Sequence, residues 1–103
     1  MEETRLTDDD IAELITRRRR QVLVHSVMYY ELDENIISDT AWDEWAAELA
    51  KLQYEHPEIA KNCPMADYFD DFDGSSGAFL PLDDTWAINK ARQLLKWRTI
   101  KDD

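Results

Sequence analysis

The sequence predicts a small all-α fold, and three observations lead to this prediction. Apolar residues recur at three- and four-residue spacing over several long stretches, as they do on the buried face of a helix. Only two Gly and three Pro occur in 103 residues, too few for the many tight turns of an all-β chain. Thr7, Ser38 and Asp84 precede these stretches and are residue types that cap helices. The length and a 44% hydrophobic fraction suit a single domain over 1–103.

The first helix is expected over residues 8–31. Thr7 is a suitable N-cap, and the three Asp that follow it lie where the helix dipole favours carboxylates. No Pro or Gly interrupts the apolar periodicity behind them. The periodic positions are Ile11, Leu14, Ile15, Val22, Leu23, Met28 and Tyr29. A turn at 32–35 and a short apolar plug at 36–37 should follow.

A second helix is expected from 39 to 55, behind the cap Ser38. It should end at His56, because Pro57 disfavours helix in the residue before it, and 57–60 can form one further turn. The inward face carries Trp42, Trp45, Ala46, Leu49 and Leu52.

Residues 66–83 are predicted to form a long loop, or a short hairpin about Gly74–Gly77. This stretch holds both Gly, two Ser, Pro81 and four aromatic residues. Asp84 should cap a last helix from Thr85 to about Ile100. The residues expected to point inward on that helix are Trp86, Ala87, Ala91, Leu94 and Leu95.

The formal net charge of −11 is concentrated in two segments. Residues 1–10 carry five acids and one Arg, and residues 66–84 carry six Asp and no base. Nucleic-acid binding needs clustered cations that release counterions, so no direct nucleic-acid contact is expected. The four arginines at 17–20 would point around most of a helix circumference. We expect a solvated face that pairs with local acids, with a phosphate or partner contact as the alternative.

The sequence also indicates where the protein resides. No apolar run approaches the ~20 residues needed to span a bilayer, and the acidic N-terminus is unlike a secretory leader. The lone Cys63 excludes a disulfide framework. A cytoplasmic protein without membrane contact is therefore expected. The oligomeric state is left open.

One segment carries a family resemblance. Residues His25–Asp43 are HSVMYYELDENIISDTAWD. They resemble the signature of the N-terminal domain of NAD-dependent DNA ligases, in which His-x-Tyr-x-Tyr-Tyr/His precedes a turn and Ile-Ser-Asp-x-x-Tyr-Asp. The likeness continues through Glu48-Leu49 to His56-Pro57-Glu58-Ile59 and covers about residues 18–60. Residues 61–103 match nothing in that family.

The resemblance implies both a fold and a ligand. In those ligases the domain is a helical hairpin that binds the nicotinamide mononucleotide half of NAD. Carried over position by position, it implies that a ligand-binding pocket is lined by Tyr29, Tyr30, Asp39, Trp42 and Asp43. Trp42 replaces the usual Tyr, which keeps a stacking surface but changes the available hydrogen bond.

The chemistry of these residue types is consistent with that ligand. Oxidised nicotinamide is a flat cation, which aromatic faces attract, and carboxylates accept hydrogen bonds from ribose hydroxyls. Asp39 and Asp43 lie four residues apart and so project from one helical face. The alternative is that Asp39 only complements the helix dipole, while Tyr29 and Trp42 are ordinary core aromatics.

Other chemistries lack their motifs. The ligase nucleophile requires Lys-x-Asp-Gly, but the only Asp-Gly, Asp73-Gly74, follows Asp71-Phe72, so ligation by this chain is excluded and no enzyme is predicted. The acidic loop departs from the EF-hand pattern, with Phe69 at the first ligand position and Leu80 at the twelfth. No zinc spacing and no nucleophile elbow occurs, so neither a metal nor a catalytic residue is expected.

Two function classes follow from these observations. The first is non-catalytic binding of a nicotinamide nucleotide or a related NAD-derived or ADP-ribose-type metabolite, for example sequestration by a viral protein. In that case the loop would supply a lid through Tyr68, Phe69, Phe72 and Phe79. The alternative is a protein-interaction module, acting as a ligase-associated subunit or inhibitor or as an acidic DNA mimic. The sequence does not identify the nucleotide.

Overall fold

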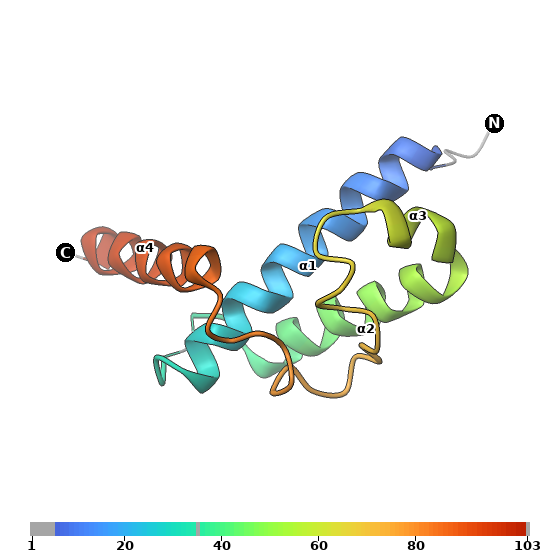
Figure 1. Cartoon of the computed structure of the whole chain (residues 1–103). Coiled ribbons are helices and arrows are strands. Elements are labelled where there is room, and N and C mark those ends of the chain that lie inside the picture. The colour runs from blue at the N-terminus through green and yellow to red at the C-terminus, as the bar shows by residue number, and fades with distance from the viewer. Residues whose placement is uncertain (1–5, 35, 103) are drawn as a thin grey trace.

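The structure, a computed structural model, describes residues 6–34 and 36–102. It contains four helices, α1 (Asp8–Tyr30), α2 (Asp39–Glu55), α3 (Pro57–Asn62) and α4 (Thr85–Asp102) (Figure 1). The described residues include no strand, which confirms the predicted all-α class. Turns and bends fill 63–84, so the alternative of a short hairpin about Gly74–Gly77 is wrong.

Side-chain caps fix where the helices of the hairpin begin. The Thr7 hydroxyl accepts a hydrogen bond from the amide of Asp10 at 3.1 Å, and the Asp10 carboxylate accepts one from the amide of Thr7. This reciprocal pair is a capping box, which satisfies donors that the first turn leaves free. Ser38 caps α2 by accepting from the amide of Ala41 at 3.0 Å. The predicted bounds of both helices are confirmed to within one residue.

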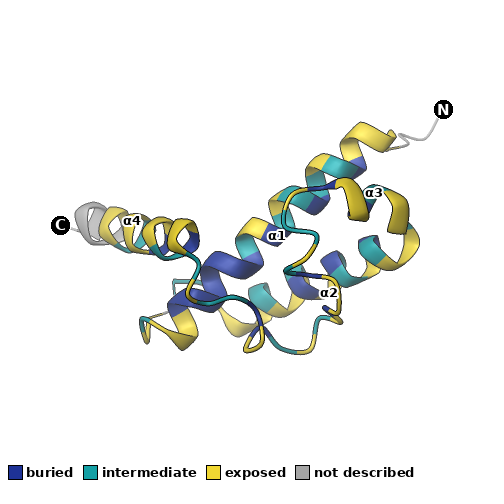
Figure 2. Ribbon diagram, viewed as in Figure 1, coloured by how far each residue is buried: buried dark blue, intermediate teal, exposed yellow. Residues whose placement is uncertain are grey.

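The core is built around α1, which packs against each of the other three helices. Every residue from Val22 to Met28 is buried, so this segment is covered on all sides (Figure 2). A helix that is apolar around most of its circumference is stable only when it is enclosed in this way. On α2 the matching buried positions are Ala46, Leu49 and Leu52, which confirms its predicted inward face.

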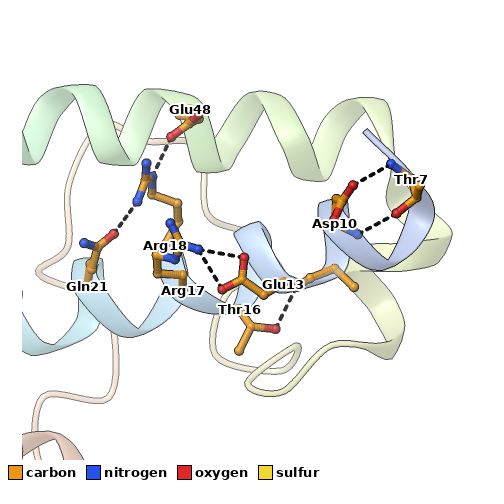
Figure 3. A network of polar contacts seen from close by, with 9 residues as sticks. Thr7, Asp10, Glu13, Thr16, Arg17, Arg18, Gln21 and Glu48 are labelled. Atoms are coloured by element: carbon orange, nitrogen blue, oxygen red, sulfur yellow. Dashed lines mark hydrogen bonds and ion pairs between the residues drawn. The ribbon is translucent and has the colours of Figure 1, made fainter. Parts of the chain in front are cut away.

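The arginine run has two different environments. Arg17 forms an ion pair with Glu13 at 2.8 Å, one helical turn away, which confirms the predicted pairing with local acids (Figure 3). Arg18 instead forms an ion pair with Glu48 on α2, and its side chain is only 18% exposed, so it is not part of a solvated face. Arg19 is only 2% exposed. The expectation of a solvated face is therefore wrong for Arg18 and Arg19.

Arg19 binds the chain where α3 ends. Its guanidinium donates to the backbone oxygens of Ala60 at 3.0 Å, Cys63 at 3.2 Å and Pro64 at 2.9 Å, and to the Gln53 side chain at 2.9 Å. The last carbonyls of a helix lack partners within it, and the planar guanidinium can serve several of them at once. Desolvation by burial lowers the pKa of Arg19 from its ordinary value. Arg19 thus fastens α1 to α2 and α3 through one buried cation.

The last helix packs on α1 through small residues. Ala87 and Ala91 are fully buried, and Asp84 caps the helix by accepting from the amide of Ala87 at 2.9 Å. Trp86 is 46% exposed, so its predicted inward position is wrong. The two alanines set the buried face, and Trp86 precedes Ala87 by one residue, which turns it about 100° away from that face.

No helix in the described part of the chain is long and apolar enough to cross a membrane.

Replacing Arg19 tests this connection. Arg19→Ala should lower the free energy of unfolding by about 2–4 kcal/mol, because it removes the four hydrogen bonds that the guanidinium donates to Gln53 and to the backbone around the end of α3. Arg19→Lys should recover only part of this loss, since a single ammonium cannot reproduce the guanidinium geometry. Urea denaturation followed by circular dichroism would measure the effect. The exposed Arg20→Ala is the control, and equal stability of the Arg19→Ala and Arg20→Ala proteins would contradict this assignment.

Candidate functional site

A pocket of about 270 Å³ lies where the end of α1, the start of α2 and the 63–84 loop meet. Residues from all three segments line it. They are His25, Ser26, Tyr29 and Tyr30 from α1, Asp39, Trp42 and Asp43 from α2, and Ser75 and Ser76 from the loop. The turn between Glu31 and Ser38 reverses the chain, so it brings the start of α2 back beside the end of α1 (Figure 1).

The structure brings together the five residues that the resemblance singled out. Tyr29, Tyr30, Asp39, Trp42 and Asp43 all line this one pocket. Tyr29 and Tyr30 are 56% and 44% exposed, and their rings meet edge to face with centroids 4.8 Å apart. Neither ring is therefore part of the hydrophobic core. For Tyr29, this rules out the alternative interpretation that it is an ordinary core aromatic.

Trp42 forms the fixed wall of the pocket. It is half-buried against the hydrophobic core, and its indole Nε1 donates to the Ser26 hydroxyl at 3.3 Å. A buried tryptophan usually finds a partner for this N–H, and here the partner comes from α1. The hydrogen bond therefore joins the two helices at the pocket and holds the ring in place.

The two pocket carboxylates lie on one face of α2. Asp39 is the first residue of the helix, Asp43 lies one turn later, and both are exposed. Neither forms an ion pair with another described residue. No Lys or Arg is among the residues that line the pocket. The site is consequently anionic and open to a cationic ligand.

His25 forms part of the pocket floor. It is 8% exposed, its ring lies 5.3 Å from that of Trp45, and its Nδ1 is buried with no hydrogen-bond partner among the described residues. Desolvation lowers the pKa of His25, so the imidazole is neutral at pH 7 and does not offset the two carboxylates. His25 was not among the residues predicted to line the pocket. The HSVMYY motif could have indicated this position, because it places His25 one helical turn before the pocket residues Tyr29 and Tyr30.

Two glycines dock the loop onto the hairpin. At Gly77 a Cβ atom would lie 2.3 Å from the Ser26 hydroxyl and 3.2 Å from the Trp42 ring. Gly74 has a φ of +87°, and a Cβ there would lie 3.1 Å from the backbone oxygen of Ala46. A Cβ at Gly77 would force Ser26 or the loop to shift, and at Gly74 the positive φ and the close Ala46 oxygen both favour glycine.

The segment between these glycines presents two serines to the pocket. Ser75 donates to the Asp73 carboxylate through both its amide, at 2.9 Å, and its hydroxyl, at 2.6 Å. These bonds stabilise the charged form and lower the pKa of Asp73. The Ser76 hydroxyl accepts from the amide of Ala78 at 3.1 Å. Ser75 and Ser76 were not predicted to line the pocket, because nothing in the local sequence pattern shows which part of a loop faces a distant helix.

The four aromatic residues expected to form a lid have other positions, and none of them lines the pocket. Phe69 and Phe72 are 1% and 6% exposed and belong to the core. The Tyr68 hydroxyl donates to Asp84 at 2.7 Å, and the Phe79 ring lies 6.2 Å from that of Phe72. Burying these rings anchors the loop, and the loop reaches the pocket through its small serines instead.

The fold and the site together are those of a small helical domain in which a hairpin carries a pocket at one end. The chain belongs to the family of DNA ligase-like, N-terminal NAD+-binding domains, whose model matches residues 8–64. That match covers α1, α2 and α3 and ends before the loop that carries Ser75 and Ser76.

Individual relatives are DNA ligases. The chain is 35% identical to the DNA ligase of Roseiflexus sp. (strain RS-1) over 54 residues, which are 52% of this chain and 7% of the relative. It is 40% identical to that of Alkalilimnicola ehrlichii over 53 residues, 52% of this chain and 8% of the relative. The chain thus matches less than a tenth of the length of these ligases. No solved structure matches it.

The close approach of Gly77 can be tested by adding a single methyl group. Gly77→Ala should lower the free energy of unfolding by about 1–3 kcal/mol, because the new Cβ overlaps the Ser26 hydroxyl. In the Ser26→Ala/Gly77→Ala double variant the loss should be smaller than the sum of the two single losses. Thermal or urea denaturation measures all three.

Ala78→Ser, at the exposed neighbouring position, is the control and should change stability by no more than about 0.5 kcal/mol. If Gly77→Ala were as stable as the original protein, the loop would not lie against Ser26 and Trp42.

Proposed function

We propose that this chain is a non-catalytic binder of a nicotinamide nucleotide or a closely related NAD-derived metabolite, and that it sequesters this ligand. The observation that carries the proposal is the convergence of Tyr29, Tyr30, Asp39, Trp42 and Asp43 on one pocket. Membership of an NAD+-binding domain family supports the same ligand class. The pocket lies within the part of the chain that this family match covers, apart from its two serines.

The pocket chemistry suits the nicotinamide half of NAD. Aromatic faces attract a flat cationic ring by stacking and cation–π interaction, worth roughly 0.5–2 kcal/mol for each contact. Trp42 is held by Ser26 and therefore offers a preorganised face, while Tyr29 and Tyr30 offer exposed ones. The carboxylates of Asp39 and Asp43 can accept hydrogen bonds from ribose hydroxyls, and bonds to a charged acceptor are the stronger kind.

Binding without turnover agrees with the side chains at hand. The 103 residues contain no Lys-x-Asp-Gly, so no lysine is placed in the sequence that accepts an adenylate in the ligases. The pocket holds aromatic rings, carboxylates and hydroxyls, which suit recognition of a ligand. Retention of an intact ligand is the role that these groups support.

Isothermal titration calorimetry with NAD and nicotinamide mononucleotide tests this proposal. Binding of at least one of them is expected, and Asp39→Ala/Asp43→Ala should weaken it by more than about tenfold. The physical reason is that each bond to a charged acceptor contributes about 1.5–3 kcal/mol.

The matched control is Glu44→Ala/Glu55→Ala, which removes two exposed carboxylates from the same helix outside the pocket. Its affinity should equal that of the original protein. Absence of heat with every NAD-related ligand, or full affinity of the Asp39→Ala/Asp43→Ala protein, would refute the proposal.

A further inference from the structure

Three open hollows adjoin on a surface separate from the pocket. The first lies between α1 and the end of α3, the second between α1, residues 64–68 and the start of α4, and the third along α4. They measure about 460, 280 and 560 Å³. Arg20 lines the first and the second, and Trp86 lines the second and the third. The hollows therefore form one continuous surface, the Arg20–Trp86 groove, which shares no lining residue with the pocket.

The groove gathers basic residues from two helices that are far apart in the sequence. Arg17 and Arg20 come from α1, and Lys90, Arg92 and Lys96 come from α4. These are five of the 12 Lys and Arg of a chain whose formal net charge is −11. The acidic first turn of α1 and helix α4 lie at opposite ends of the molecule, so that turn leaves the cations of α4 unneutralised (Figure 1).

Most of these cations have no acid beside them. Arg17 pairs with Glu13, whereas Arg20 and the three cations of α4 form no ion pair with any other residue that the structure describes. Arg92 and Lys96 are exposed and lie four residues apart, a spacing at which like charges repel and weaken a helix. A carboxylate from a partner would remove this repulsion.

The acid within the groove does not supply that carboxylate. Asp84 accepts from the Tyr68 hydroxyl at 2.7 Å and from the amide of Ala87 at 2.9 Å. It thus serves as the cap of α4 and as the partner of Tyr68. The groove consequently presents an excess of positive charge to solvent, although the whole chain is acidic.

The middle of the groove is apolar. Trp86 is 46% exposed there, and Pro64 and Met65 line the same hollow. The core does not need the Trp86 ring, since Ala87 and Ala91 form the buried face of α4. Tryptophan and arginine are the residue types that contribute most to protein interfaces, and methionine adapts to different partners. An apolar centre with cations on both sides suits a segment that has an apolar side chain between acids.

A short acidic polypeptide fits this groove better than the alternatives do. Duplex DNA carries one charge for every ~1.7 Å of its axis, so a nucleic acid would continue past the groove over a chain of net charge −11. A polypeptide can confine its carboxylates to the few positions that face the cations. A second copy of this chain would bring the same large negative charge, which opposes association.

We infer that the Arg20–Trp86 groove binds an acidic segment of another protein, in which carboxylates pair with Arg20, Lys90 and Lys96 and an aromatic side chain packs against Trp86. A partner contact was the alternative expectation for the arginine run, and Arg20 is the residue that makes it. This interaction goes beyond the proposed function, because it uses a different surface from the nucleotide pocket.

Fluorescence anisotropy with labelled polypeptides tests the inference. The probes are a random copolymer of glutamate and tyrosine, poly-glutamate of the same length, and an oligothymidylate of similar charge. The copolymer should bind saturably and at least about tenfold more tightly than poly-glutamate, because only the copolymer offers rings to Trp86. Its binding should weaken as the ionic strength rises from about 0.05 to 0.5 M, since salt screens the ion pairs.

Two variants separate the contributions of charge and ring. Lys90→Glu/Lys96→Glu should weaken binding of both polypeptides by more than about tenfold. Trp86→Ala should weaken binding of the copolymer and bring it close to that of poly-glutamate. The matched control is Lys51→Glu/Lys61→Glu, which makes the same charge change at two exposed lysines outside the groove and should bind the copolymer more tightly than Lys90→Glu/Lys96→Glu does.

Several results would overturn the inference. They are no binding of the copolymer at low salt, equal binding of the two polypeptides, and equal affinities of the Lys90→Glu/Lys96→Glu and Lys51→Glu/Lys61→Glu proteins. Tighter binding of the oligothymidylate would assign the groove to nucleic acid instead. Dimers in analytical ultracentrifugation that Lys90→Glu/Lys96→Glu dissociates would assign it to a second copy. The Lys90→Glu/Lys96→Glu protein should bind nicotinamide mononucleotide like the original protein, so failure of this inference leaves the proposed function intact.

Discussion

The site depends on the packing of α2 against the enclosed segment Val22–Met28 of α1. This segment is buried on every side, so its register against α2 is fixed by close packing and cannot slide without exposing apolar surface. His25 and Ser26 belong to it, and Trp42 reaches it across the helix pair to bond with Ser26. The same contacts that stabilise the core thus position the floor and one wall of the pocket.

Residues away from the pocket also hold the hairpin and the loop in place. Arg19 ties α1 to the end of α3, which keeps α2 from moving away at the end opposite the pocket. Gly74 and Gly77 let the loop backbone rest directly on the helices, and Phe69 and Phe72 anchor it in the core. The pocket is consequently composite, with most of it lying in the family-matched segment and its last wall in a loop beyond it.

Much of this architecture could be predicted from the sequence, because the relevant signals are local. Thr7 and Ser38 mark helix starts through hydrogen bonds spanning three residues, and Pro57 ends α2 through a steric effect on its neighbour. The convergence of Tyr29 with Asp39 followed from two helices and a short turn.

The features that were missed depend on contacts distant in sequence. Arg19 lies in a run of four arginines, and only its position opposite 60–64 distinguishes it from its neighbours. Trp86 has the residue type of a core position, but the two alanines beside it decide which face of α4 meets α1. Phe69 and Phe72, which were predicted to form a lid, likewise lie in the core, since burying a large ring contributes more to stability than leaving it at the surface.

The proposed function requires that a flat cationic ring and its sugar occupy the space between α1, α2 and the loop residues Ser75 and Ser76. Nuclear magnetic resonance of the isotope-labelled chain during titration with nicotinamide mononucleotide tests it most directly, because it locates the contact residue by residue. Saturable shifts are expected for the Trp42 indole N–H, the Tyr29 and Tyr30 ring signals and the amides of Ser75 and Ser76. Shifts confined to α4 around Lys90 and Lys96, or no shifts at the pocket residues, would contradict it.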